Sequence, residues 1–373
     1  MSEVRVLGVE LRDFRTYARA DLSLGAGLTV VHGPNGVGKS NLLEALYFGC
    51  CARSPRTRNE RELVRFGCQA TRVSVRLTDS VSGREQHELS VGFQPGQPKR
   101  MMSDGAPVER ALDVPYRPLI SVFMPERLEL IKGAPGLRRA HLDQVVAALW
   151  PTRAEDRRAY TRVLAQRNAL LGRIRVGAAS RDAILTWDIQ LARHALALRD
   201  HRARAVELLA EPFASRAAQL GLTGVASLEY RPRTRARDEQ ELLAELRERL
   251  DSDLQRGFSS HGPHRDELAF LRDDRELRAY GSQGEQRLAL LALLLAERSV
   301  LADQRARMPL MLLDDVMSEL DADRRELLAG ELRSGGQTLI ASTDLAHVPG
   351  AGDPAVTRLR VSSGVVLSEA LAA

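Results

Sequence analysis

Hydrophobic positions along this chain of 373 residues follow two kinds of pattern, which occupy different stretches of the sequence. Short apolar runs that fit buried parallel strands alternate with longer helical segments. Two other runs alternate between apolar and polar residues and, with a turn at Asp104-Gly105, predict an antiparallel layer. The apolar runs are Leu28–Val31, Pro309–Leu313 and Gln337–Thr343, and the alternating runs are Thr71–Thr78 and Gln86–Phe93. The pattern therefore predicts an α/β protein.

From about Gly136 to Leu220 the chain is rich in Ala, Leu and Arg, and its apolar residues recur at helical spacing. Small residues at Gly177–Ser180 interrupt this spacing, so we expect a helical hairpin or small bundle. A helix of about forty residues is about 60 Å long, too short for a long coiled coil. The arginines along the segment fit either a solvated helix face or a DNA contact.

One motif identifies a nucleotide site. Gly33-Pro34-Asn35-Gly36-Val37-Gly38-Lys39-Ser40 fills every position of the phosphate-loop pattern, between the strand Leu28–Val31 and a helix that starts near Asn41. The glycines let backbone N–H groups point at one phosphate chain, and the helix adds its positive dipole end. We expect Lys39 to reach the β- and γ-phosphates of ATP and Ser40 to bind Mg²⁺.

Two carboxylates end an apolar strand far downstream. Asp314 is positioned to hold Mg²⁺ through water, and Asp315 to orient or deprotonate the attacking water. The alternative is an ordinary strand followed by an acidic helix cap. Together with the intact phosphate loop, the pattern favours the catalytic interpretation.

A third motif opens an apolar helix about thirty residues before that strand. Ser282 and Gly284 can present free N–H groups to an anion, and Ser282 with Glu285 also fits a capping box. This order of motifs resembles the ABC ATPase superfamily, with Ser318–Asp321 similar to its D-loop. ABC transporter domains usually carry a histidine just after the strand that matches Gln337–Thr343, whereas here Ser342-Thr343-Asp344 stands at that place.

These motifs predict an ABC-type P-loop ATPase head, with a mixed sheet, a flanking antiparallel β-layer and an inserted short helical arm. We expect residues 1–135 to form the first lobe, 136–250 the arm, and 251–373 the rest of the head.

Composition adds little to this picture. The net charge of +5 permits a polyanionic partner without requiring one. No apolar run approaches the ~20 residues of a membrane span, and the first 30 residues do not resemble a signal peptide. Cys50, Cys51 and Cys68 give neither a disulfide framework nor a zinc pattern. We therefore expect a cytoplasmic protein with no membrane association.

Several less general motifs accompany the phosphate loop, and in this order and chain length they resemble the RecF family of bacterial recombination-repair ATPases over essentially the whole chain. Arg127 departs from the family pattern, in which we expect an acidic residue. The motifs are Asp13-Phe14-Arg15-Thr16-Tyr17, Ser54-Pro55-Arg56-Thr57, residues 125–133, Arg138-Arg139 with Leu142-Asp143, Gly262-Pro263-His264-Arg265-Asp266, residues 282–287 and residues 312–316.

The resemblance implies a head that binds ATP and Mg²⁺ and forms a homodimer around two nucleotides, each held by the phosphate loop of one subunit and Ser282/Gly284 of the other. It implies binding to gapped DNA and single–double-strand junctions, where RecF acts with RecO and RecR to load RecA in replication, repair and the SOS response. His264 and Arg265 are either functional or packing and ion-pair residues.

Two other functions remain open at this stage. An ATPase subunit of a transporter or of another SMC-like complex would share the head, and a small-molecule phosphotransferase would share the phosphate loop.

Overall fold

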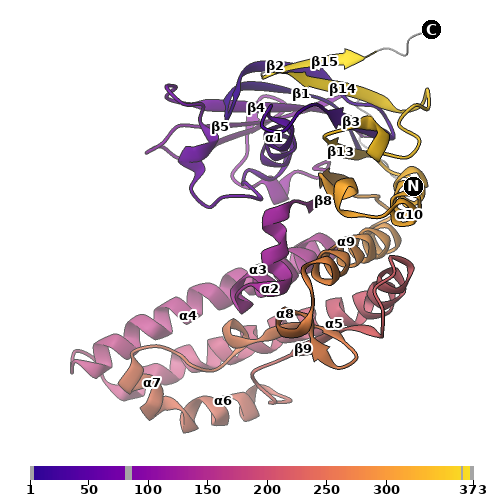
Figure 1. The fold of residues 1–373 in the computed structure, drawn as a ribbon. Coiled ribbons are helices and arrows are strands. Elements are labelled where there is room, and N and C mark those ends of the chain that lie inside the picture. Colours follow the sequence, from indigo (N-terminus) through magenta and orange to yellow (C-terminus); the bar gives the residue numbers. More distant parts are fainter. Residues whose placement is uncertain (1–3, 80–85, 363, 370–373) are drawn as a thin grey trace. The chain divides into compact units, whose positions relative to one another are not determined.

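The computed structural model describes residues 4–79, 86–362 and 364–369 (Figure 1). The chain forms two compact units, each assembled from segments that are distant in sequence. Unit 1 comprises Met1–Leu128, Gln219–Gly221 and Leu290–Ala373, and unit 2 comprises Glu129–Ala218 and Leu222–Ala289. These bounds differ from the three expected segments, because unit 2 also takes in residues 251–289, and helix α9 (Gln283–Arg305) begins in unit 2 and ends in unit 1. The three-segment division stays a prediction.

A mostly parallel sheet organises unit 1. Its strand order is β15-β14-β3-β13-β12-β8, and only β15 runs antiparallel to its neighbour. Strands β12 and β13 are buried along their whole length, which explains their unbroken apolar sequence. The strands are β3 (Leu28–His32), β8 (Ile120–Phe123), β12 (Leu310–Asp314), β13 (Thr338–Ser342), β14 (Thr357–Ser362) and β15 (Val365–Glu369).

An antiparallel sheet in the order β2-β1-β4-β5-β6-β7 forms the second layer of unit 1. The predicted turn at Asp104-Gly105 joins β6 to β7. The strands are β1 (Val4–Phe14), β2 (Tyr17–Ser23), β4 (Thr71–Asp79), β5 (His87–Phe93), β6 (Arg100–Ser103) and β7 (Ala106–Pro107). Helix α10 (Ala322–Arg333) also belongs to this unit.

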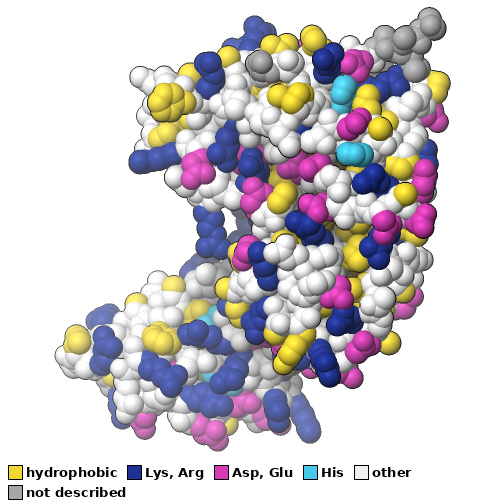
Figure 2. All heavy atoms as spheres, viewed as in Figure 1, with side chains coloured by type: hydrophobic (Ala, Val, Ile, Leu, Met, Phe, Trp, Pro, Cys, Tyr) yellow, Lys and Arg dark blue, Asp and Glu magenta, His cyan; other side chains and the backbone are white. Residues whose placement is uncertain are grey.

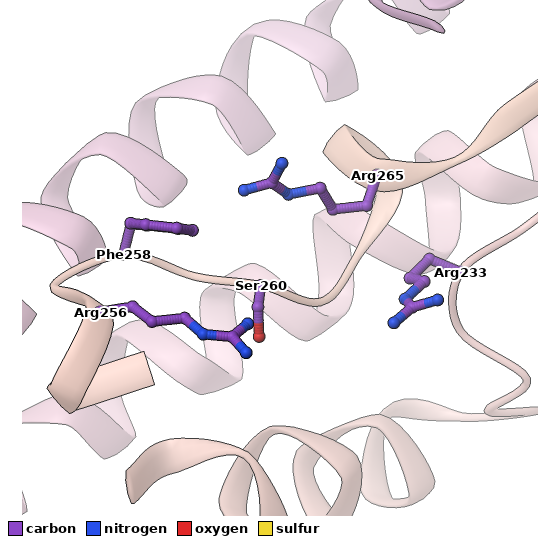
Figure 3. Close-up of a pocket in the computed structure, with 5 residues that line it drawn as sticks. All are labelled: Arg233, Arg256, Phe258, Ser260 and Arg265. Carbon is purple, nitrogen blue, oxygen red and sulfur yellow. The ribbon is translucent and has the colours of Figure 1, made fainter. Parts of the chain in front are cut away.

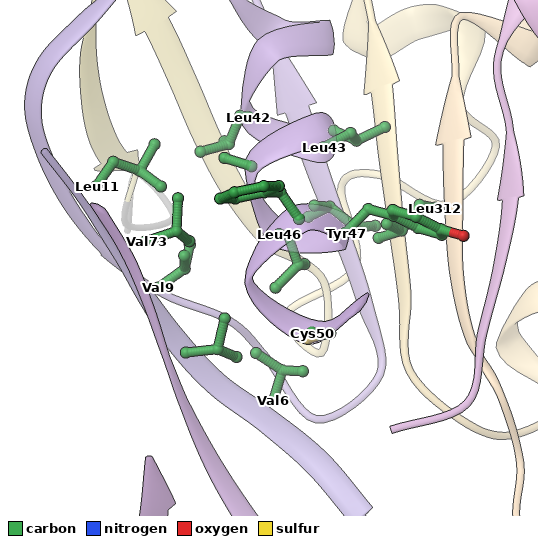
Figure 4. Packing of buried hydrophobic residues seen from close by; sticks show 14 of the residues in the cluster. Val6, Val9, Leu11, Leu42, Leu43, Leu46, Tyr47, Cys50, Val73 and Leu312 are labelled. Atoms are coloured by element: carbon green, nitrogen blue, oxygen red, sulfur yellow. The ribbon is translucent and has the colours of Figure 1, made fainter. Parts of the chain in front are cut away.

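Helix α1 (Lys39–Cys51) packs between the two sheets (Figure 4). Leu42 and Leu46 share one buried cluster with Val9 of β1 and Leu312 of β12. Gly49 permits close packing, because a Cβ there would lie 2.5 Å from a methyl group of Val75. The helix that leaves the phosphate loop is therefore fixed on both faces.

Unit 2 is mainly helical. Helices α4 and α5 pack against each other through Tyr160 and Val163 on one side and Leu191 and Leu198 on the other. They confirm the predicted helical hairpin, and α5, with 36 residues, is about 54 Å long. The helices are α2 (Glu129–Lys132), α3 (Pro135–Leu149), α4 (Ala154–Arg175), α5 (Ile184–Gln219), α6 (Glu239–Glu248), α7 (Leu250–Arg256) and α8 (Leu277–Tyr280).

A small sheet in the order β11-β10-β9 completes unit 2, with β9 (Ala226–Arg231), β10 (Glu267–Arg272) and β11 (Arg275–Glu276). Across the described ranges of both units, every helix is too short or too polar to cross a membrane.

Candidate nucleotide site

The phosphate-loop motif and the two carboxylates lie at one edge of the parallel sheet. Strand β13 separates β3 from β12, and the register pairs His32 with Ser342 and Ala341 with Asp314. Neighbouring strands lie about 4.8 Å apart, so the ends of β3 and β12 are only about 10 Å apart. Parallel strands all end at this edge, which is where open α/β sheets bind ligands.

The loop itself has the backbone that its glycines predict. Gly36 and Gly38 have φ angles of 81° and 115°, in the region that favours glycine. At Gly38 a Cβ would lie 2.9 Å from the Thr16 hydroxyl oxygen. The Tyr17 hydroxyl donates a hydrogen bond of 2.9 Å to the Gly38 carbonyl. The turn between β1 and β2 therefore braces the loop, while its crown, Pro34 to Gly36, is exposed.

Lys39 is the buried cation of the site. Its ammonium donates hydrogen bonds to the carbonyls of Gly33 at 2.7 Å and Pro34 at 2.9 Å, which hold it across the base of the loop. Burial lowers its pKa, and the carboxylates of Asp315 and Asp314 act in the opposite direction. A desolvated ammonium inside a glycine-rich loop at the start of a helix fits a phosphate chain.

The two carboxylates differ in their surroundings. Burial raises the pKa of Asp314, and a hydrogen bond with Ser40 opposes that shift. A hydroxyl and a carboxylate in contact are the oxygen ligands that Mg²⁺ takes in such sites, so the residues fit this ion. Asp315 has a left-handed backbone with φ 52°. Its Oδ1 is buried and has no hydrogen-bond partner among the described residues.

A buried ion-pair cluster on α1 was not predicted. Glu44 is fully buried and accepts two hydrogen bonds of 2.9 Å from Arg15. It also accepts a hydrogen bond from the Ser54 hydroxyl at 2.5 Å and one from Arg56 at 3.2 Å. The motifs around Arg15 and Arg56 thus hold the helix that follows the phosphate loop.

Arg56 connects this cluster to the nucleotide site. It donates to the Asn41 side chain at 3.0 Å and to Glu126 at 2.9 Å, in the 3₁₀ turn Pro125–Leu128. Its positive charge lowers the pKa of Asp314, whereas Glu126 raises it. The sequence offered a signal for this role only through the family motif that contains Arg56.

Ser282 and Gly284 lie at the start of α9, within unit 2. The capping box is formed: the Ser282 N–H donates to the Glu285 carboxylate at 2.7 Å, and the Glu285 N–H donates to the Ser282 hydroxyl at 3.3 Å. Arg272 pairs with the same carboxylate. A Cβ at Gly284 would meet no described atom within 4 Å, so this helix start is open.

The fold and this edge of the sheet define an ABC-type P-loop ATPase. A model described as an AAA domain matches residues 9–110. The Smc head domain of Pyrococcus furiosus, at 17% identity and a TM-score of 0.59, covers 99% of this chain and 97% of its own, and it supports the fold.

Closer relatives identify the family. The DNA replication and repair protein RecF of Acidothermus cellulolyticus is 39% identical over 347 residues, 90% of this chain and 92% of its own. The protein of the same name from Myxococcus xanthus is 36% identical, with 97% of each chain covered. A solved structure of the recombination mediator protein RecF with ATP has a TM-score of 0.88 at 26% identity and covers 98% of both chains. The chain belongs to the RecF family.

Proposed function

We propose that the loop from Gly33 to Asn41 binds the phosphates of ATP, with Lys39 contacting the β- and γ-phosphates. Ser40 and Asp314 would hold Mg²⁺, which neutralises charge on the phosphates during transfer. Asp315 would orient the attacking water and accept its proton. Its buried, unpartnered Oδ1 supports this role, because a buried acceptor without a partner among the described residues is costly unless a water or substrate satisfies it.

One observation carries this assignment. The Lys39 ammonium is hydrogen-bonded inside the glycine loop, and it lies close enough to Asp314 and Asp315 for both charges to act on its pKa. A glycine turn formed by chance before a helix would have no reason to bring a buried cation and two carboxylates to one sheet edge.

The second half of the function is DNA binding. The protein would bind gapped DNA and single–double-strand junctions as an ATP-bound homodimer, and act with RecR and RecO to place RecA on single strands. Unit 2 supports this proposal, because it carries the whole net charge of +5, whereas positive and negative side chains balance in unit 1. Lys and Arg side chains gather over α4, α6 and α7 in Figure 2.

The experiment is binding of the full chain to gapped, single-stranded and double-stranded DNA of equal length, each with ATP, ADP or no nucleotide. We expect binding to depend on ATP, to favour the gapped strand and to weaken as salt rises, because neutralised phosphates release counterions. Sequence preference should be weak. Equal binding with and without nucleotide, or ATP turnover that responds to a metabolite and not to DNA, would overturn the proposal.

A further inference from the structure

A pocket of about 440 Å³ opens on the surface of unit 2, and none of the residues assigned to ATP lines it (Figure 3). Three elements form it: the segment after β9, the end of α7 with the loop that follows it, and the 3₁₀ turn Pro263–Arg265. The residues that line it are Arg233, Arg256, Phe258, Ser260 and Arg265.

Positive charge dominates this pocket. The side chains of Arg233, Arg256 and Arg265 extend from three directions toward the space around Ser260 in Figure 3. Among the described residues, none of these three guanidinium groups forms a salt bridge, and all three residues are exposed. A further guanidinium, that of Arg175, packs against Gly257. Such a concentration of like charge favours an anion.

Two carboxylates next to pocket residues in the sequence or in space are already paired with other groups. Asp253 is fully buried, and its Oδ1 accepts hydrogen bonds from the N–H and hydroxyl of Ser260 at 3.0 and 2.6 Å. Its Oδ2 accepts from Arg167 at 2.9 Å. Asp266, next to Arg265, is buried and paired with Arg202. Because these two carboxylates are engaged in internal pairs, they do not compete for the three pocket arginines.

An aromatic ring lies among these charges. Phe258 is 42% exposed, and the Arg265 guanidinium lies 5.4 Å from the centre of its ring. Aromatic residues make up only 4% of the chain, and most of the large ones are in the core. An exposed ring beside arginines is the arrangement by which proteins bind single strands, with a base stacked on the ring and its phosphate on the cations.

We propose that this pocket binds one unpaired nucleotide of single-stranded DNA, with its phosphate among Arg233, Arg256 and Arg265 and its base against Phe258. The inference rests on the proposed DNA-binding function and assigns that function a definite contact. It also divides the motif Gly262–Asp266 into two roles, because Asp266 is a buried ion-pair residue whereas Arg265 faces the pocket. An acidic peptide would form ion pairs with the arginines, but it would have no base to stack on the Phe258 ring.

The test measures binding of the full chain to a fluorescent oligothymidylate across a salt series. Phe258→Ala should weaken binding roughly five-fold or more, as removal of a stacking ring does. Replacing both Arg256 and Arg265 by Ala should weaken binding and reduce the salt slope by about 0.7 for each phosphate that is no longer neutralised. An abasic strand of equal charge should bind the wild type and Phe258→Ala equally well.

Matched controls separate the pocket from general effects. Arg193→Ala removes an exposed arginine of the same unit, and Phe66→Ala removes a fully exposed ring in unit 1; both should bind like wild type. ATP turnover without DNA should be unchanged in every pocket variant. Ultraviolet cross-linking of a bromodeoxyuridine strand to wild type should label the tryptic peptide 257–265, a readout that needs no variant.

Each other outcome overturns the inference. If wild type binds the strand and the pocket variants bind it equally well, the assignment of the contact to this pocket is wrong. The proposed DNA-binding function then stands, with its contact elsewhere. If wild type binds no DNA, the proposed DNA function fails and the pocket assignment fails with it. If polyglutamate of equal charge competes as well as the oligonucleotide, the pocket is a site for acidic peptides.

Discussion

The ammonium group of Lys39 is subject to two opposing effects at the base of the loop. Burial lowers its pKa, and the charges of Asp315 and Asp314 oppose that shift, while two loop carbonyls accept its hydrogen bonds. The geometry of those acceptors suits a compact, tetrahedral donor, whereas a guanidinium is planar and larger. The identity of this residue therefore matters more than its charge.

Lys39→Ala should abolish tight ATP binding, because it removes the ammonium that the Gly33 and Pro34 carbonyls hold in the loop. Lys39→Arg should retain part of the ATP binding and impair hydrolysis, since the planar guanidinium group of arginine cannot reproduce the contacts of the ammonium group. Titration with a fluorescent ATP analogue and single-turnover hydrolysis measure the two effects. Unchanged turnover in Lys39→Ala would contradict the assigned site.

Asp314 and Asp315 should differ when each is replaced by Asn. Asp315→Asn should leave ATP binding intact and slow hydrolysis, because the amide cannot take a proton from water. Asp314→Asn should weaken the part of ATP binding that depends on Mg²⁺, since it removes the carboxylate beside Ser40. ATP affinity measured with Mg²⁺ and with EDTA distinguishes them, and identical behaviour would show that their roles are not divided as proposed.

At the scale of elements, α1 depends on a buried charge on its face. Glu44 is completely buried against Arg15 and Arg56, whose side chains are 18% and 26% exposed. Glu44→Gln should lower the free energy of unfolding by about 2 kcal/mol, less than for a fully buried pair because water reaches both arginines. Glu62→Gln is the control: Glu62 also pairs with Arg15, at 3.7 Å, but is 48% exposed.

Urea unfolding of both variants measures this difference. Surface pairs contribute little, so Glu62→Gln should unfold like wild type. Equal stability of wild type and Glu44→Gln would show that the cluster does not hold α1. Asp314 also has Arg56 nearby, so Glu44→Gln should alter Mg²⁺-dependent ATP binding as well.

In unit 2, His264 should make the stability of the fold depend on pH. Its Nδ1 lies 2.6 Å from the Tyr160 hydroxyl and its Nε2 lies 2.9 Å from the Ser259 carbonyl, so the neutral ring donates to Ser259 and accepts from Tyr160. Burial lowers its pKa and the positive charges of Arg265 and Arg139 add to the shift, whereas the hydrogen bond to Ser259 and the charge of Asp266 oppose it. As pH falls, the His264 ring therefore takes up a proton in the unfolded chain at a higher pH than in the folded chain. The free energy of unfolding falls as pH drops below about 6.5.

His264→Gln should reduce the dependence of Tm on pH between about pH 7 and pH 5, whatever its effect on Tm at neutral pH. His194→Gln is the control, because His194 is 27% exposed and close to the Asp156 carboxylate. Thermal melts of the three proteins across this pH range give the comparison. An unchanged pH dependence in His264→Gln would mean that this ring is not the titrating group.

What the sequence could predict depends on how local each feature is. The phosphate loop and the apolar strand before Asp314 were predictable, because a few consecutive residues carry both their backbone geometry and their chemistry. The Glu44 cluster was not, because its partners Arg15 and Ser54 are 29 and 10 residues away and a charge is unexpected on a buried helix face. The bounds of the two units were also out of reach, because one continuous helix, α9, crosses between them.

At the scale of the whole molecule, the two units differ in net charge. Unit 1 is neutral and holds the residues assigned to ATP, apart from Ser282 and Gly284, whereas unit 2 holds all of the excess positive charge. The open start of α9 also belongs to unit 2. A γ-phosphate from a second subunit would place negative charge at the positive end of this helix of 23 residues.

Dimerisation should therefore depend on ATP and on Ser282. The capping box uses the N–H groups of Ser282 and Glu285, and within the described part of the chain no hydrogen bond involves the N–H of Gly284, which remains available to a phosphate. ADP lacks the γ-phosphate, so it makes no differential contact and should not favour the dimer. Ser282→Arg places a bulky side chain at this helix start and leaves the phosphate loop of its own subunit intact.

Light scattering or sedimentation should show a dimer for wild type with ATP, and monomers for wild type with ADP and for Ser282→Arg with ATP. Ser180→Arg is the matched control: it adds the same side chain at another exposed cap, where the Ser180 hydroxyl accepts from the Asp182 N–H, and it should dimerise like wild type. ATP binding by Ser282→Arg, measured on the monomer, should be near that of a wild-type monomer. A dimer of equal strength in all these conditions would mean that nucleotide does not join the subunits, because the γ-phosphate that distinguishes ATP from ADP at α9 would then have no effect on assembly.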